Sequence, residues 1–397
     1  MSDQSERIEI GRLGVASLLV LKLLAISPLY GMAFNIKAIA QSYEMSNAVA
    51  GAIVSTELLG LAAGSLLFAT VFSRFNYRAA YWASLPLLCA MQLASLLTTA
   101  TEPLFIWRAL SGVAMGCLLG AVTSAVGRTT KPETLFGVMS SGTHLMGAAL
   151  ALILPQAMGL STKFPSLSLL SASDAVFGVY FLFAGASLFF IGSTPAPDAA
   201  PRMPRNATAR ANTSLRGSVT LLALSLFLFG SFALSLYLVS LGSEQAGLNA
   251  AQVGLALMVG SCLGIVTPLV AGYVSSRLGA LLPAAVLLTL IGVLAGLLGT
   301  TTSPVAFLIA APLFVSVPLA FTPIVLAALA RIDGSGRLLA ITPVVSLLCL
   351  SLAPMAGGAI SRHGDYALNG WLAMGCSLLA IPLLAWAIGS TMKPANA

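Results

Sequence analysis

Long apolar runs separated by short polar joints make up most of this sequence. A helix needs about 20 apolar residues to cross roughly 30 Å of hydrocarbon. Breaking the chain at its charged and its Pro-, Gly- or Ser-rich joints leaves twelve runs of sufficient length. We therefore expect membrane-spanning helices at about residues 13–35, 48–72, 79–99, 103–126, 134–158, 173–193, 218–241, 250–273, 280–300, 304–330, 338–360 and 370–390.

The composition supports an all-α, polytopic membrane protein. Of the 397 residues, 58% are hydrophobic and 8% are charged, whereas an ordinary soluble domain carries about a quarter charged residues. The net charge of +7 comes from basic residues spread over short joints, without a basic patch interleaved with aromatics. We therefore expect a lipid bilayer as the partner and no nucleic acid.

The basic residues also predict the topology. Twelve spans place both termini on one side, and 14 basic residues fall on that side against three, Lys37, Lys163 and Arg362, on the other. By the positive-inside rule both termini are cytoplasmic, in a multi-pass protein of the cell inner membrane. Residues 195–217 are polar and rich in Pro, Ala and Arg, which is typical of a flexible linker. We expect it to join two six-helix bundles, residues 1–194 and 218–397.

The two predicted bundles are related by a repeat. A shift of 203 residues lays Arg74 on Arg277, Arg128 on Arg331 and Ser46 on Asn249. Ser46 and Asn249 lie where the second helix of each half needs an N-cap. One offset that aligns three separated places favours duplication and pseudo-symmetric bundles.

Two loops resemble the signature of the major facilitator superfamily of secondary transporters, which repeats a GxLaDRxGRR-like loop between spans 2 and 3 and between spans 8 and 9. Here the copies are ATVFSRFNYR, with Arg74 and Arg78, and GYVSSRLG, with Arg277. The resemblance implies that these arginines belong to gating loops. Both copies have serine where the family has an acidic residue. The alternative to a gating role is that these arginines only follow the positive-inside rule.

Span 4 carries a second resemblance to this family, whose motif there is RxxxGxxxG. Arg108, Gly112, Gly116 and Gly120 recur at four-residue steps, so they share one helix face on which glycines permit close helix packing. We expect Arg108 to point into the bundle. The alternative is an arginine that snorkels to water beside Trp107.

Four ionisable side chains interrupt the apolar spans of the first half: Lys22, Glu57, Arg108 and His144. Each formal charge near a bilayer centre costs about 2.5 to 3.5 kcal/mol on insertion scales, so these groups indicate a functional polar site. The resemblance implies that spans 1 and 4 line a central cavity, and we expect all four residues to reach one chamber. Glu57 is the candidate proton carrier, and a permanent Lys22–Glu57 ion pair is the alternative.

The positive balance of this site favours an anionic solute. Arg108 would hold a carboxylate by its planar fork, with Lys22 as a point charge. His144 would contact substrate or relay a proton, or it only joins helices. The second half has uncharged spans, and Tyr237 with neighbouring aromatics would form an apolar wall of the substrate site.

The sequence therefore predicts a secondary active transporter that works by alternating access. The expected activity is proton-coupled uptake of a small organic anion, and the alternative is proton-coupled efflux of drugs or other small molecules. We expect no enzyme activity, cofactor or metal, because the chain has two histidines and its five cysteines show no ligand spacing. We also expect a monomer.

Overall fold

The computed structural model describes residues 11–71, 77–127, 132–160, 170–196, 215–332, 337–361 and 366–388. Within these residues the regular structure is helical, which confirms the all-α prediction. The chain divides into two compact units. Unit 1 contains residues 1–45 and 53–205, and unit 2 contains Ser46–Ala52 and residues 206–397. The helix of the second predicted span, Asn47–Thr70, therefore begins in unit 2 and continues into unit 1.

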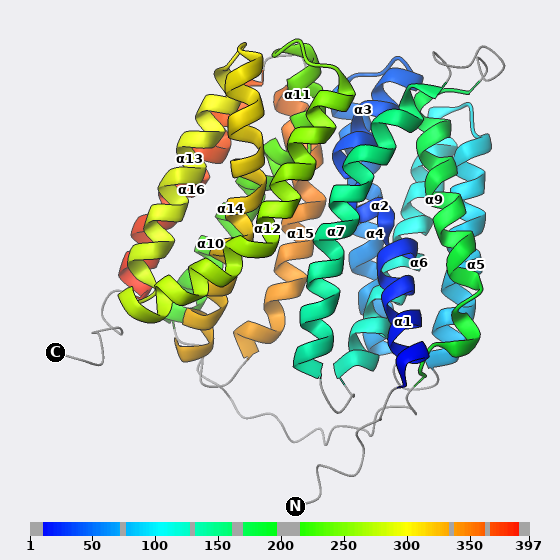
Figure 1. The fold of residues 1–397 in the computed structure, drawn as a ribbon, viewed down its shortest axis with the longest axis horizontal. Helices are drawn as coiled ribbons and strands as arrows, with labels where there is room; N and C mark the ends of the chain where they lie inside the picture. Colours follow the sequence, from blue (N-terminus) through cyan, green and yellow to red (C-terminus); the bar gives the residue numbers. More distant parts are fainter. Residues whose placement is uncertain are drawn as a thin grey trace, which may run out of the picture. The chain divides into compact units, whose positions relative to one another are not determined.

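Unit 1 holds the helices of the first six predicted spans, apart from residues 47–52 (Figure 1). The first span is divided into four pieces and the other five are single helices. They are α1 (Arg12–Val20), η1 (Leu21–Ala25), α2 (Ser27–Tyr30), α3 (Met32–Ser42), α4 (Asn47–Thr70), α5 (Tyr77–Leu97), α6 (Thr101–Gly127), α7 (Pro132–Met158) and α9 (Ala172–Leu188), followed by the short η4 (Ile191–Ser193).

Unit 2 holds the other six predicted spans in the same order (Figure 1). The first of these is divided into two pieces. Its helices are α10 (Leu215–Ser235), α11 (Leu238–Glu244), α12 (Ala250–Leu278), α13 (Leu281–Thr300), α14 (Pro304–Ile332), α15 (Arg337–Ile360) and α16 (Ala367–Ile388). Among the described residues, eight helices are long and apolar enough to cross a membrane by themselves.

The first span differs from the continuous helix that its apolar pattern predicts. A π-helical turn occupies Leu21–Ala25, and the chain bends again at Gly31. Pro28 explains part of this, because proline has no N–H to donate to the preceding turn. Wide π turns inside helices occur frequently at functional sites, and this one carries Lys22.

Helix ends follow the local sequence where the structure shows caps. Asn249 caps α12 by accepting from the Gln252 backbone N–H at 2.9 Å, while the Gln252 side chain accepts from the Asn249 backbone. This capping box confirms the cap expected at Asn249. Gly279 ends α12 with φ +78°, a left-handed conformation that glycine adopts without steric cost.

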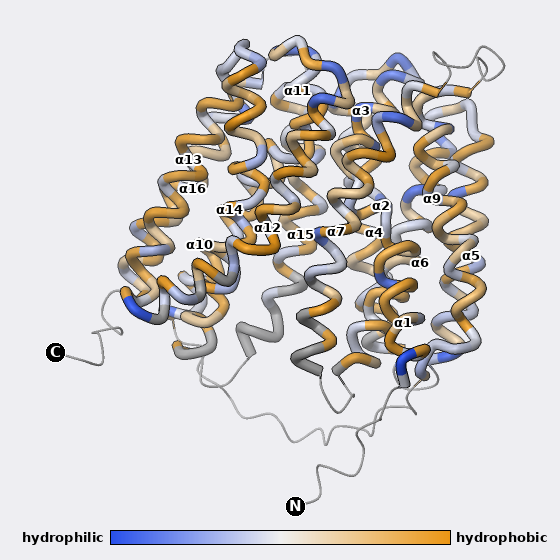
Figure 2. Tube along the Cα trace, viewed as in Figure 1, coloured by the Kyte–Doolittle hydropathy of each residue, from blue (hydrophilic) through white to orange (hydrophobic). Residues whose placement is uncertain are grey.

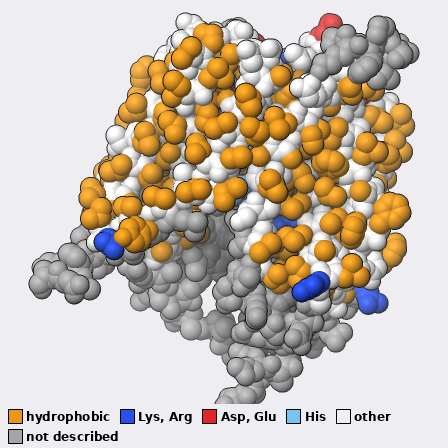
Figure 3. Space-filling model, viewed as in Figure 1, with side chains coloured by type: hydrophobic (Ala, Val, Ile, Leu, Met, Phe, Trp, Pro, Cys, Tyr) orange, Lys and Arg blue, Asp and Glu red, His pale blue; other side chains and the backbone are white. Residues whose placement is uncertain are grey.

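The surfaces of both units suit lipid. Hydrophobic residues extend along most of each helix, and hydrophilic residues are concentrated near helix ends with a few interruptions inside (Figure 2). Hydrophobic side chains are spread over the coloured part of the face in Figure 3. Large hydrophobic residues such as Leu145, Leu182 and Val266 are more than half exposed. A water-soluble protein rarely exposes so much contiguous apolar surface. The chain is therefore a multi-pass membrane protein.

Candidate functional site

Close packing of α4 against α6 positions the charged centre of unit 1. A Cβ atom built on Gly112 would overlap the Glu57 carbonyl oxygen, and one on Gly116 would overlap the Leu61 carbonyl oxygen. These glycines of α6 thus let the two backbones touch. Gly120, the third glycine of the span-4 motif, faces the Phe68 side chain instead.

Glu57 on α4 and Arg108 on α6 form a buried ion pair across this contact. Arg108 donates from Nε to Glu57 Oε2 at 3.2 Å and from Nη2 to Glu57 Oε1, which makes a two-point fork on the carboxylate. The two residues are 0% and 1% exposed. Arg108 therefore does not snorkel to water. Its remaining nitrogen, Nη1, donates to Gln92 Oε1 on α5 at 2.7 Å.

Three further residues complete the surroundings of the Glu57–Arg108 pair. Ser111 Oγ donates to Glu57 Oε1 at 3.2 Å, and Gln92 Nε2 donates to Ser111 Oγ at 3.1 Å. The Phe177 ring on α9 lies under the guanidinium, 4.8 Å from its carbon to the ring centroid, a cation–π arrangement. The two charges are thus paired and further hydrogen-bonded, as buried charges need to be.

A second hydrogen-bond chain runs from Tyr180, beside this centre, to the break in the first span. The Tyr180 hydroxyl on α9 donates to Asn35 Oδ1 at 2.6 Å, and Asn35 Nδ2 donates to the Pro28 carbonyl oxygen at 3.3 Å. Tyr180 is buried and lies near enough to Glu57 and Arg108 to interact with both charges. A change in the charge pair therefore has a physical route to the broken helix.

Lys22 and His144 form a separate polar region of unit 1. Both are partly exposed, in contrast to Glu57 and Arg108. The two side chains are near enough for their charges to interact, and next to them Tyr30 and Thr143 share a side-chain hydrogen bond. The π turn packs on α7 here, because a Cβ on Gly142 would lie 3.0 Å from Leu23.

This arrangement differs from the expected single chamber. The carboxylate of Glu57 pairs with Arg108 and not with Lys22. The alternative of a permanent Lys22–Glu57 pair is therefore wrong for this structure. The physical reason is the glycine contact of α4 with α6, which brings the planar fork of the arginine directly onto the carboxylate. Glu57 and Arg108 are sealed, while Lys22 and His144 are not.

Tyr237 of unit 2 is engaged in internal contacts. It is fully buried, and its hydroxyl donates to the carbonyl oxygens of Pro354 at 2.5 Å and Asn47 at 3.2 Å. Gly51 and Gly358 leave the space that this hydroxyl occupies. The placement favours a helix-packing role over the expected substrate contact.

A polar cluster surrounds the first turn of α4 in unit 2. Asn47 Nδ2 donates to the Tyr366 hydroxyl at 2.7 Å, and this hydroxyl donates to Glu244 Oε2 at 2.7 Å. Burial and the Glu244 carboxylate raise the pKa of Tyr366 above its ordinary value, so the phenol keeps the proton that it donates. These contacts hold the start of α4 against the end of α11 and the residue that precedes α16.

The expected gating arginines lie at the ends of helices. Arg277 is exposed near the end of α12, with its guanidinium 4.6 Å from the Tyr273 ring centroid. Arg78 is exposed in the first turn of α5, and Arg74 lies outside the described residues. In the described part of the chain, no group of three His, Cys, Asp or Glu side chains could hold a metal ion.

The sequence analysis missed four polar members of the site: Asn35, Gln92, Ser111 and Tyr180. Gln92 was the most visible of them, because an amide in the middle of an apolar span needs a partner inside the protein. Asn35 gave the same kind of signal at the end of the first span. Ser111 and Tyr180 gave none, because hydroxyls in membrane helices commonly bond to their own backbone.

The described residues thus form an all-α membrane protein with two helical units and a buried charge pair inside one of them. The family model of the Major Facilitator Superfamily matches residues 18–337, so the chain belongs to that family. It is a transporter and not an enzyme, and a small-molecule substrate follows from the family. No curated protein matches the chain by sequence.

Solved transporter structures share the fold. A peptide transporter POT in complex with sulfate is similar with a TM-score of 0.74 at 15% identity, over 98% of this chain and 98% of that one. The nucleoside transporter NupG, crystallised as a point mutant, gives 0.72 at 12% identity, over 96% and 100%. A bacterial homologue of the human lysosomal transporter Spinster, inward-facing and unoccupied, gives 0.69 at 14% identity, over 95% and 96%.

Proposed function

We propose that the protein takes up a small organic anion together with a proton, and that Arg108 exchanges Glu57 for the carboxylate of the cargo. One observation carries the proposal. A guanidinium already holds a carboxylate by a two-point fork inside an apolar bundle. A solute carboxylate has the same geometry and charge as the Glu57 side chain, so it can replace that side chain on Arg108.

The exchange requires a proton on Glu57. A released carboxylate left ionised in an apolar site would cost several kcal/mol, whereas a protonated one loses that cost and can still accept a hydrogen bond from Ser111. Binding of one anion and one proton therefore leaves the charge of the site unchanged. This balance couples the two cargoes without a further charged residue.

Lys22 and His144 would contact the anion as it enters unit 1. Both are partly exposed and lie on the first span and on α7, whereas the charge pair lies on α4 and α6. Lys22 has no acidic partner among the described residues. An anion attracted to this ammonium meets the break of the first span. Hydrogen bonds join that break to Tyr180 through Asn35, and Tyr180 lies within electrostatic reach of Glu57 and Arg108. We infer that Lys22 attracts the cargo and that Arg108 holds it.

The first test replaces Glu57 with Gln in protein reconstituted into liposomes. A thermal-shift screen of organic acids on the purified wild type supplies the cargo. The Glu57→Gln variant keeps a side chain of the same size but cannot cycle a proton, so uptake driven by a proton gradient should fall to background while exchange of preloaded cargo continues. The matched control is Glu102→Gln, because Glu102 is exposed in the first turn of α6.

Unchanged uphill uptake by Glu57→Gln would reject the coupling role of this carboxylate. A resistance phenotype for cationic or neutral drugs in a pump-deficient host, lost in the same variant, would instead support proton-coupled efflux. The nucleoside and peptide named for the similar structures are further cargoes for the screen, although identities of 12% and 15% carry the fold alone.

A further inference from the structure

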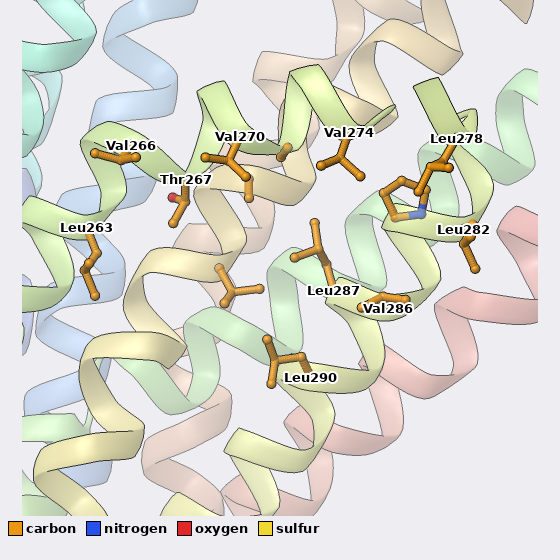
Figure 4. Close-up of a pocket in the computed structure, with 14 residues that line it drawn as sticks. Leu263, Val266, Thr267, Val270, Val274, Leu278, Leu282, Val286, Leu287 and Leu290 are labelled. Atoms are coloured by element: carbon orange, nitrogen blue, oxygen red, sulfur yellow. The ribbon is translucent and has the colours of Figure 1, made fainter. Parts of the chain in front are cut away.

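An apolar groove opens between α12 and α13 of unit 2, away from the charge pair of unit 1. It has a volume of about 590 Å³ and is lined along α12 by residues such as Val266, Val270 and Leu278, and along α13 by Val286 and Leu290 (Figure 4). Val317 and Ala320 of α14 form its floor. Val266, Val270 and Val286 are each more than half exposed, so the groove opens to the surroundings of the protein.

The path of α12 creates this groove. α12 contains Pro268 and bends in its second half (Figure 1), as expected where a proline removes a backbone hydrogen bond. Among the described residues of the lining, Thr267 is the single polar one, and its hydroxyl donates to the Ser316 carbonyl oxygen at 3.1 Å. The described lining therefore offers a ligand apolar contact.

A positive charge lies at one end of the groove. Val266, Val270, Tyr273 and Arg277 follow one another at steps of three or four residues on α12, so they form one stripe along the helix. The first two line the groove, and Leu278 lines it next to Arg277. The guanidinium of Arg277 is exposed and rests on the Tyr273 ring.

The described part of unit 2 has no acid near Arg277. Glu244, the acidic side chain described there, precedes α12 and lies at its opposite end. A helix of 29 residues is about 43 Å long when straight. A ligand with hydrocarbon in the groove and an anionic group at the Arg277 end therefore meets complementary chemistry at both places.

We propose that the groove binds one anionic phospholipid, with an acyl chain along α12 and α13 and the phosphate paired with Arg277. In a protein that spans a bilayer, an open apolar groove of this size is filled by hydrocarbon chains of the surrounding lipid. An arginine at the polar boundary selects among lipids by the charge of the head group. A phospholipid provides both an acyl chain for the apolar groove and a phosphate for the Arg277 guanidinium.

The test counts lipids bound to the purified full-length protein by native mass spectrometry. The probes are phosphatidylglycerol and phosphatidylcholine with identical palmitoyl and oleoyl chains. Phosphatidylglycerol should bind saturably, with one tightest molecule per chain. Val270→Trp fills the groove and should weaken this binding about tenfold. Arg277→Gln should weaken phosphatidylglycerol about fivefold and leave phosphatidylcholine nearly unchanged.

Two variants serve as matched controls. Leu255→Trp adds the same ring to an exposed position of α12 outside the groove, and Arg216→Gln removes an exposed arginine from α10. Both should bind phosphatidylglycerol as the wild type does. Glycerol phosphate, which lacks acyl chains, should not compete, and competition by it would assign the site to a free phosphate.

Three results would overturn the proposal. In the first, Val270→Trp binds phosphatidylglycerol as tightly as Leu255→Trp. In the second, Arg277→Gln weakens both lipids equally, so that no head group is recognised at the end of the groove. In the third, the wild type forms a dimer that Val270→Trp abolishes, which would make the groove an interface with a second copy of the chain.

Discussion

Burying the Glu57 and Arg108 charges requires desolvation free energy, and removing one of the two residues lowers the stability of the protein. Removing one partner of a buried ion pair leaves an unpaired charge and destabilises a protein by about 3 to 5 kcal/mol, whereas replacing both partners with apolar groups is often neutral. Both residues are sealed from solvent and hydrogen-bonded to further side chains. A pair that stability does not require is consistent with a role in transport.

This asymmetry gives a prediction at the residue scale. Arg108→Met should destabilise the protein by about 3 to 5 kcal/mol, and adding Glu57→Met should restore most of the loss. Thermal unfolding in detergent measures both changes, with the exposed Arg216→Met as the control that should be near the wild type. Strictly additive losses in the double variant would mean that the two side chains do not depend on each other.

The contact of α4 with α6 sets the geometry of the pair at the scale of elements. A Cβ on Gly112 would overlap the Glu57 carbonyl oxygen, which is backbone and cannot rotate away. The glycines of α6 therefore allow close packing and also determine the position of Arg108. They fix the distance at which the Arg108 fork reaches the carboxylate one turn away.

Gly112→Ala should consequently separate α4 from α6 and lower both the unfolding temperature and the rate of transport. The expected loss is about 2 to 4 kcal/mol, because two packed backbones must shift. Gly185→Ala in α9 is the matched control, since a Cβ there meets nothing within 4 Å and alanine favours a helix by up to about 1 kcal/mol. Equal behaviour of the two variants would contradict the role given to the glycine contact.

The sequence predicted the elements better than it predicted their contacts. Length and apolarity indicated the spans, and the described helices follow them in order. The four-residue spacing of Arg108 and the glycines indicated the packed face of α6. The cation that pairs with Glu57 did not follow, because Lys22 and Arg108 carry the same charge and only the α4–α6 contact distinguishes them.

The break of the first span shows a second limit of the sequence. Pro28 lies in an apolar run, and proline is tolerated in membrane helices when neighbouring groups bond to the freed backbone. Here Asn35 donates to the Pro28 carbonyl oxygen and Tyr180 fixes Asn35. Asn35 and Tyr180 are 145 positions apart in the sequence, so no local sequence pattern reveals their hydrogen bond.

At the scale of the whole molecule, α4 is the element that both units share. Its first residues belong to unit 2, where Asn47 bonds to Tyr366, and its later residues carry Glu57 in unit 1. Alternating access requires the two halves of a transporter to move around a central site. The helix that carries Glu57 therefore begins among residues of unit 2.

The most direct test of the account measures protons taken up when the purified protein binds its anion. The protein is held in weak buffer near neutral pH with an indicator dye, and the organic acid that gives the largest thermal shift is added in its ionised form. The wild type and Glu102→Gln should each take up about one proton per anion bound, and Glu57→Gln should take up none. Saturating anion binding without proton uptake by the wild type, or equal uptake by Glu57→Gln, would contradict the exchange of Glu57 for cargo on Arg108.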